Sequence, residues 1–91
     1  MFFRRNRNFK TEGHFLLARV RTDKTGEIIP VRISKASELS PTADGYFVRK
    51  PLVGPKTLDR ATIELTLSRR TQRVKQAIVE GGMLVPVREW E

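Results

Sequence analysis

Three arginines, Arg69, Arg70 and Arg73, are the side chains of this sequence whose types and spacing fit a definite chemistry. Each guanidinium carries a permanent charge and a planar set of donors that matches a phosphate or a carboxylate. They follow Ser68, whose hydroxyl can accept from the free amides of a first helical turn. A helix start already presents partial positive charge, and no Asp or Glu stands in this turn to offset it. The cluster therefore predicts an anion-binding site; the alternative is that the arginines are helix formers whose stems cover apolar surface.

A second basic cluster stands at the beginning of the chain. Residues 1–12 hold four cations interleaved with three phenylalanines, and the first ten of these residues contain no acid: Arg4, Arg5, Arg7 and Lys10 with Phe2, Phe3 and Phe9. This pattern predicts a basic arm that neutralises phosphates while its aromatic rings stack or wedge. A frayed terminus that charge keeps soluble is the alternative.

The whole chain is basic. Eighteen Lys and Arg against ten Asp and Glu give a formal net charge of +8 over 91 residues, which predicts long-range attraction to polyanions. Nucleic acid, acidic protein and anionic lipid are all negatively charged and are all candidate partners. The remaining candidate contacts lie on predicted strands and in a long loop: Phe15, Arg19, Arg21, Arg32, Arg49, Lys50 and Arg88.

Catalysis has little support in this composition. The chain has one histidine, His14, no cysteine, and no pair of acids at a spacing typical of shared proton chemistry. We therefore expect no enzyme activity, no metal and no cofactor. The absence of cysteine suits a reducing interior, the apolar runs are too short to cross a bilayer, and residues 1–10 lack the apolar core of a signal peptide. We expect a cytoplasmic protein or a component of a large intracellular or viral assembly.

The elements that must position these side chains begin with residues 61–67. Ile63, Leu65 and Leu67 alternate with polar residues, which predicts a strand with one buried face. Thr71, Val74, Ala77 and Ile78 then follow at spacings of three and four, which predicts a helix over about 69–80 that ends at Gly81. A further strand follows at 83–87.

Upstream, residues 14–21 and 27–34 form a predicted hairpin. Because Pro30 cannot donate to a ladder, we expect the second strand to lie at a sheet edge or to carry a bulge. Residues 35–60 are a long, irregular insert, in which we expect one short strand at residues 45–50 (GYFVRK) after the turn at Asp44-Gly45. The predicted fold is a single α+β domain over 13–91, in which three to five mainly antiparallel strands carry one helix on one face. We expect the core to contain Leu16, Val20, Ile29, Val31, Ile63, Leu65, Leu67, Val74, Ile78, Val85 and Val87. The opposite sheet face would expose Phe15, Leu17, Arg19, Arg21, Arg32, Leu84 and Arg88.

Two family resemblances concern the last third of the chain. Leu67 to Leu84, with its LSRRT segment, resembles the recognition-helix end of a winged-helix DNA-binding domain, but Gln72 and Lys75 depart from that pattern. Residues 61–90 resemble the small CpcD-type linker domain of phycobilisomes: an alternating strand, a basic helix carrying Val74, then Gly81-Gly82, a strand core at Leu84-Val85, and Arg88. The second resemblance implies an assembly role, in which a basic plug bridges acidic subunits.

Two functions are therefore open. The leading hypothesis is a non-enzymatic module that binds RNA or single-stranded DNA through the arm, the outer sheet face and the helix start. The alternative is a linker or structural subunit that docks onto acidic proteins in a large complex. Both hypotheses use the same charges.

Overall fold

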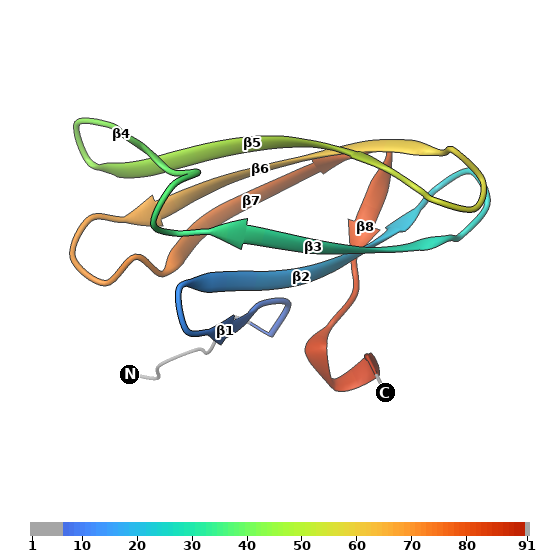
Figure 1. Cartoon of the computed structure of the whole chain (residues 1–91), viewed down its shortest axis with the longest axis horizontal. Coiled ribbons are helices and arrows are strands. Elements are labelled where there is room, and N and C mark those ends of the chain that lie inside the picture. The colour runs from blue at the N-terminus through green and yellow to red at the C-terminus, as the bar shows by residue number, and fades with distance from the viewer. Residues whose placement is uncertain (1–6, 91) are drawn as a thin grey trace.

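The computed structural model describes residues 7–90, which form two antiparallel sheets packed face to face (Figure 1). Sheet A contains β1 (Lys10–Glu12), β2 (Phe15–Thr22), β3 (Ile28–Ser34) and β8 (Gly82–Leu84). Sheet B contains β4 (Ser40–Pro41), β5 (Gly45–Val53), β6 (Arg60–Ser68) and β7 (Val74–Glu80). Within residues 7–90 the one helix is a short 3-10 turn, η1 (Val87–Glu89). The fold is a β-sandwich, so the predicted α+β class is wrong.

The predicted hairpin is confirmed as β2 and β3. Their alternating side chains place three cross-strand pairs on the buried face: Leu16 with Ile33, Ala18 with Val31, and Val20 with Ile29. β1 and β8 both pair with the other edge of β2, one near each end of that strand. β3 is therefore an edge strand, as predicted from Pro30, which has no amide hydrogen for a further neighbour.

Sheet B supplies the other half of the core. The predicted strand at 61–67 lies within β6, where Ile63, Leu65 and Leu67 are fully buried against sheet A. β5 pairs with β6 along its whole length. It confirms the short strand expected at residues 45–50 of the insert and extends it to Val53. The inner face of sheet A is thus covered by a second sheet, where the sequence predicted a helix.

The predicted helix at 69–80 is the main error, and a β-bulge accounts for it. In β7 the inward residues opposite Leu67, Leu65 and Ile63 are Val74, Ala77 and Val79. Lys75 is an extra residue in this register, because Leu67 pairs with Val74 and Thr66 with Gln76. Because of the bulge, the inward residues Val74 and Ala77 are three positions apart, whereas inward residues of a regular strand are two apart. A spacing of three is also typical of a helix. Ile78 consequently faces outward and is 47% exposed, so its predicted place in the core is also wrong.

The segment before β7 is a tight hairpin loop. The Gln72 amide donates to the Ser68 carbonyl (2.9 Å), and the Thr71 amide donates to the Ser68 hydroxyl (3.3 Å). Ser68 therefore caps a single hydrogen-bonded turn. Gln72 then adopts a positive φ of 57°, and the Ser68 amide donates to the Arg73 carbonyl, which closes the hairpin. The predicted cap is present, but the chain returns along the sheet after one turn.

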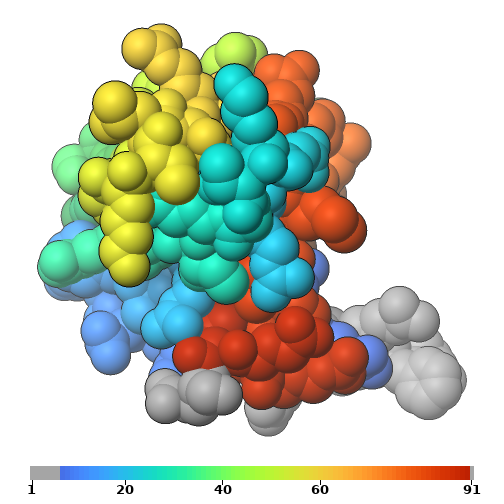
Figure 2. Space-filling view, turned by 90° about the vertical axis from the view of Figure 1, so that its right-hand side faces the viewer, coloured from blue at the N-terminus to red at the C-terminus, as the bar shows by residue number. Residues whose placement is uncertain are grey.

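The two ends of the sandwich differ. At one end the β2–β3 loop (cyan) packs beside the β5–β6 loop (yellow), as Figure 2 shows. The opposite end, on the left of Figure 1, gathers the β1–β2 turn, the end of β3 and the β6–β7 loop. No helix among residues 7–90 is long and apolar enough to cross a membrane.

Candidate functional site

An open groove of about 780 Å³ lies at the end of the sandwich that contains the β6–β7 loop. We call it the basic groove, because five cations line it and no Asp or Glu does: Arg7, Lys10, Lys35, Arg73 and Arg88. Its apolar lining comes from Phe9, Leu16, Val74 and Val87, and its remaining lining residues are Thr11 and Gln72. None of the five cations forms an ion pair with another described residue. The groove is thus a concave, cationic surface with an apolar floor.

Distant parts of the sequence build this groove. Arg7 and Lys10 come from the segment that leads into β1 and from β1 itself, and Lys35 follows β3. Arg73 stands at the end of the β6–β7 loop, and Arg88 lies in η1. The Val87 amide donates to the Arg7 carbonyl (2.7 Å), so the segments at the two ends of the described chain are fastened together along the groove. Four of the five cations were predicted contact residues, and the structure brings these four to one place.

The arginine cluster at 69, 70 and 73 occupies a different structure from the predicted one. Because no helix begins at Ser68, no helix dipole acts on these side chains, and that part of the prediction is wrong. Arg69 and Arg70 are exposed in the hairpin loop, and Arg73 lines the basic groove. The cluster therefore extends the groove's positive surface onto the loop beside it.

The outer face of sheet A carries most of the other predicted contacts. The Arg32 guanidinium lies 3.8 Å from the centre of the Phe15 ring, and Arg21 is exposed on the same face. Arg19 contacts the C-terminal segment: its Nη1 donates to the Trp90 carbonyl at 2.8 Å, and its guanidinium lies 4.9 Å from the Trp90 ring centre. Leu84 and Arg88 were wrongly assigned to this face. Leu84 packs against the core, opposite Val20, and Arg88 lines the basic groove.

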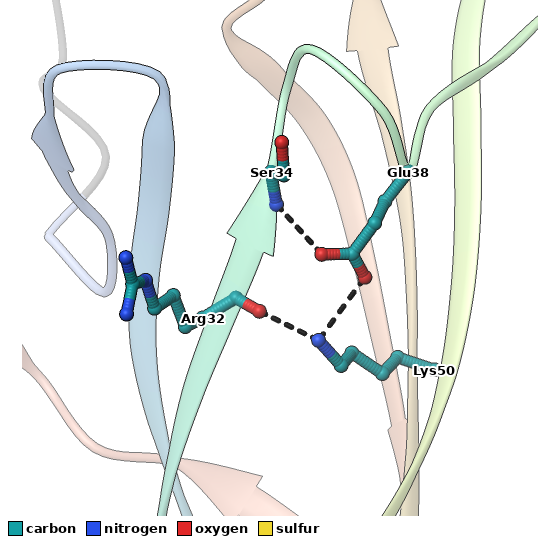
Figure 3. A network of polar contacts seen from close by, with 4 residues as sticks. All are labelled: Arg32, Ser34, Glu38 and Lys50. Carbon is teal, nitrogen blue, oxygen red and sulfur yellow. Dashed lines mark hydrogen bonds and ion pairs between the residues drawn. The ribbon is translucent and has the colours of Figure 1, made fainter.

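Arg49 and Lys50 have partners within the fold. Arg49 forms an ion pair with Glu64 (2.7 Å) on the outer face of sheet B. The Lys50 ammonium donates to the Arg32 carbonyl (2.6 Å) and contacts Glu38 (3.1 Å), and Glu38 also accepts from the Ser34 amide (Figure 3). The Arg32 side chain points away from this network in Figure 3. Lys50 therefore joins the two sheets at their β3 and β5 edges, and the geometry gives it a structural role. Arg4 and Arg5 lie outside the described residues.

Two acidic side chains with internal partners, Glu27 and Asp59, lie at the end of the sandwich away from the basic groove. Glu27, before β3, accepts from the Thr57 hydroxyl (2.6 Å) and from the Lys56 and Thr57 amides (both 3.0 Å). The Thr57 hydroxyl is the main reason that the pKa of Glu27 is lowered, and the two amides lower it further. These bonds hold the β2–β3 loop on the β5–β6 loop and place negative charge far from the groove.

Six residues that line the groove were not among the predicted contacts: Thr11, Leu16, Lys35, Gln72, Val74 and Val87. Lys35 carried no local signal, because it is a single cation after a strand. Val74 and Val87 were assigned to the core, and both are only partly buried. They line the groove because sheet B covers sheet A but leaves this end of the sandwich open, and no local sequence pattern indicates that arrangement.

Comparisons with protein families, with curated proteins and with solved structures found no match. Among residues 7–90, no group of three or more His, Asp and Glu side chains is placed to hold a metal ion. The segment that both resemblances read as a helix, around Val74, is strand β7. The charge and the shape of the basic groove are therefore the features that bear on function.

Proposed function

We propose that this chain is a non-enzymatic nucleic-acid-binding module that holds a single strand of RNA or DNA in the basic groove. The observation that carries the proposal is the set of five cations around an apolar floor with no acidic side chain among the lining residues. Lys and Arg neutralise phosphates, whereas an aromatic ring such as Phe9 offers a surface on which an unpaired base can stack. The formal net charge of +8 adds a long-range attraction to the same ligand.

A single strand fits this surface better than a duplex does. Sequence-independent binders of single strands combine a cationic groove that follows the backbone with apolar or aromatic surface for the bases. In a duplex the faces of the bases are already stacked on one another and their edges are paired, so Phe9 and Val87 would find no base surface to contact. The exposed Arg69 and Arg70 beside the groove supply further contacts to the backbone of the strand.

The alternative, a subunit that docks onto acidic proteins, is favoured by a different observation. β7 begins at the groove and pairs only with β6 among the described strands, so its other edge is open to an added strand. An extended acidic peptide could hydrogen-bond to this edge and place its carboxylates on the groove cations. Such a partner would depend on apolar and main-chain contacts in addition to charge.

The dependence of affinity on salt separates the two functions. We would measure the fluorescence anisotropy of a labelled single-stranded oligonucleotide and of a duplex at several salt concentrations. Release of counterions predicts a slope of log affinity against log salt of about −0.7 for each phosphate neutralised on a single strand, so five contacts predict about −3.5. Absence of oligonucleotide binding at low salt, together with recovery of an acidic protein at fixed stoichiometry, would support the docking function.

A matched pair of variants tests the site. Reversing the charge of Arg73 and Arg88 to Glu should abolish most of the affinity, because both line the groove. Reversing Lys24 and Lys56, which are exposed at the other end of the sandwich, changes the net charge by the same amount and should weaken binding only slightly. If the two double variants lose the same amount of affinity, binding depends on the net charge of the protein, and the groove is not a specific site.

A further inference from the structure

The wall of the basic groove that carries Val87 and Arg88 belongs to a segment with unusual attachments. This segment, Val85–Trp90, is called the C-terminal strap here. Its first residue donates from its amide to the Arg19 carbonyl (2.8 Å), and its last residue accepts at its carbonyl from Arg19 Nη1 (2.8 Å). Both ends of the strap are thus fastened to the same residue of β2.

Trp90 closes the strap on itself. Its indole Nε1 donates to the Val85 carbonyl (2.9 Å), and its ring lies against the Arg19 guanidinium at 4.9 Å from the ring centre. The Arg19 guanidinium thus makes two contacts to Trp90, a cation–π contact with the ring and a hydrogen bond donated to the carbonyl, and both are stronger in a partly buried setting than in water. The residues between the two ends have few other attachments, of which the Val87 amide on the Arg7 carbonyl (2.7 Å) is one.

We infer that Trp90 and Arg19 are positioning residues that hold Arg88 and Val87 on the basic groove, and that Arg19 acts through the strap without touching the ligand. This inference rests on the proposed function for its effect on binding. Without the Trp90 contacts, the strap would be fastened only by the amides of Val85 and Val87, and Arg88, which follows the second of these, would sample more positions. A cation that must be ordered on binding contributes less to affinity than one already in place.

A double-mutant cycle tests this coupling. Arg88→Ala should weaken the binding of a labelled single-stranded oligonucleotide roughly tenfold, as expected for one charge-assisted hydrogen bond. Trp90→Ala should weaken it by a similar factor, and adding Arg88→Ala to Trp90→Ala should change it by less than about twofold, since Arg88 is no longer held. Arg73→Ala, on a different segment of the groove, should keep its full effect in both backgrounds. Independent effects of Arg88→Ala and Trp90→Ala would overturn the inference.

Hydrogen exchange provides a readout that needs no ligand. In Trp90→Ala the Val87 amide should exchange faster, because its bond to the Arg7 carbonyl depends on the strap, whereas the Leu65 amide in the core should keep its protection. Trp90→Phe, which keeps a ring over Arg19 but lacks the indole donor, should give an intermediate rate. Unchanged protection at Val87, or lost protection at Leu65 as well, would contradict a positioning role. If the wild-type protein fails to bind oligonucleotides, the proposed function falls, and the exchange rates still decide whether Trp90 holds the strap.

Discussion

Asp59 in the β5–β6 loop accepts a hydrogen bond from the hydroxyl of Thr22 at the end of β2, with 2.7 Å between Oδ2 and Oγ1. Both residues are buried, and the same carboxylate oxygen accepts from the Thr25 hydroxyl at 2.6 Å. These two hydroxyls, Thr25 first, hold the pKa of Asp59 below its ordinary value. One carboxylate therefore connects sheet A to sheet B at the end of the sandwich remote from the groove.

Acid should destabilise the fold. The pKa values of Asp59, Glu27 and Glu38 are all lowered, the last mainly by the Ser34 amide. A group with a lowered pKa contributes stability above its unfolded-state pKa and loses that stability as the pH falls through the folded-state pKa. With ordinary values of 3.8 for Asp and 4.5 for Glu, the free energy of unfolding should be steady at neutral pH and decrease below about pH 5. Urea unfolding from pH 7 to pH 3 measures this dependence.

The matched control for the acid prediction is Asp59→Asn. This variant should be less stable at pH 7 and should lose less stability on acidification, because one of the three lowered carboxyl groups is gone. A wild-type protein that gains stability between pH 5 and pH 3 would contradict the prediction.

Lys50→Met should destabilise the sandwich by about 1 kcal/mol, since it keeps most of the apolar stem and removes the bonds to the Arg32 carbonyl and to Glu38. The Arg32 carbonyl would also lose its side-chain donor. Thermal unfolding gives the difference, and Lys24→Met, at an exposed loop position, should change stability by no more than about 0.5 kcal/mol. Equal stability of Lys50→Met and wild type would mean that the two sheets need no polar link at this edge.

Gly81→Ala should cost more stability than Gly26→Ala. Both glycines have a positive φ, of 83° and 82°, so each substitution strains the backbone by about 1 kcal/mol. A Cβ at Gly26 meets nothing within 4 Å, whereas one at Gly81 lies 2.8 Å from the Arg60 carbonyl oxygen, where the chain crosses from β7 to β8. Chemical denaturation measures the free energy of unfolding of both variants. The loss in Gly26→Ala gives the cost of the positive φ, and the additional loss in Gly81→Ala gives the cost of the clash with the Arg60 carbonyl. Equal losses in the two variants would show that the backbone at Arg60 moves aside freely.

Gln72→Gly should stabilise the protein, because Gln72 holds a positive φ of 57° that glycine reaches without a steric penalty. The expected gain is about 0.5 kcal/mol, after subtraction of the entropy that a new glycine adds to the unfolded chain. Leu58→Gly should behave alike, since Leu58 has a φ of 64° and is 71% exposed. Lys75→Gly, at the bulge in β7, is the opposite control and should lose stability. A loss in Gln72→Gly would mean that its side chain holds the hairpin loop together.

Arg69 and Arg70 should matter for the rate of binding and little for folding. Their change to Glu leaves a loop of exposed side chains and should alter thermal stability by no more than about 0.5 kcal/mol. The association rate with an oligonucleotide should fall severalfold at low salt, because charge at the lip of a groove steers the approach of a polyanion. Stopped-flow anisotropy at two salt concentrations measures this; a large loss of stability with an unchanged rate would make the arginines packing groups.

The sequence predicted local strands well where side chains alternate without interruption. Ile63, Leu65 and Leu67 are buried as expected, since an alternating pattern determines which face of a strand is apolar. It failed at Val74 because one extra residue, Lys75, changes the apolar spacing, and no local signal marks a bulge. The sequence predicted only part of the basic groove. It shows which residues are charged, but the proximity of Arg7, Lys35 and Arg88 depends on how the two sheets are stacked.

The bond between the Val87 amide and the Arg7 carbonyl has a consequence for the order of events during synthesis. A ribosome delivers Arg7 before Arg88, so the groove has no complete wall until η1 has emerged. A nascent chain that has made only the β2–β3 hairpin carries cations but no built site. The cationic lining is therefore assembled only after the segment that carries Val87 and Arg88 has left the ribosome.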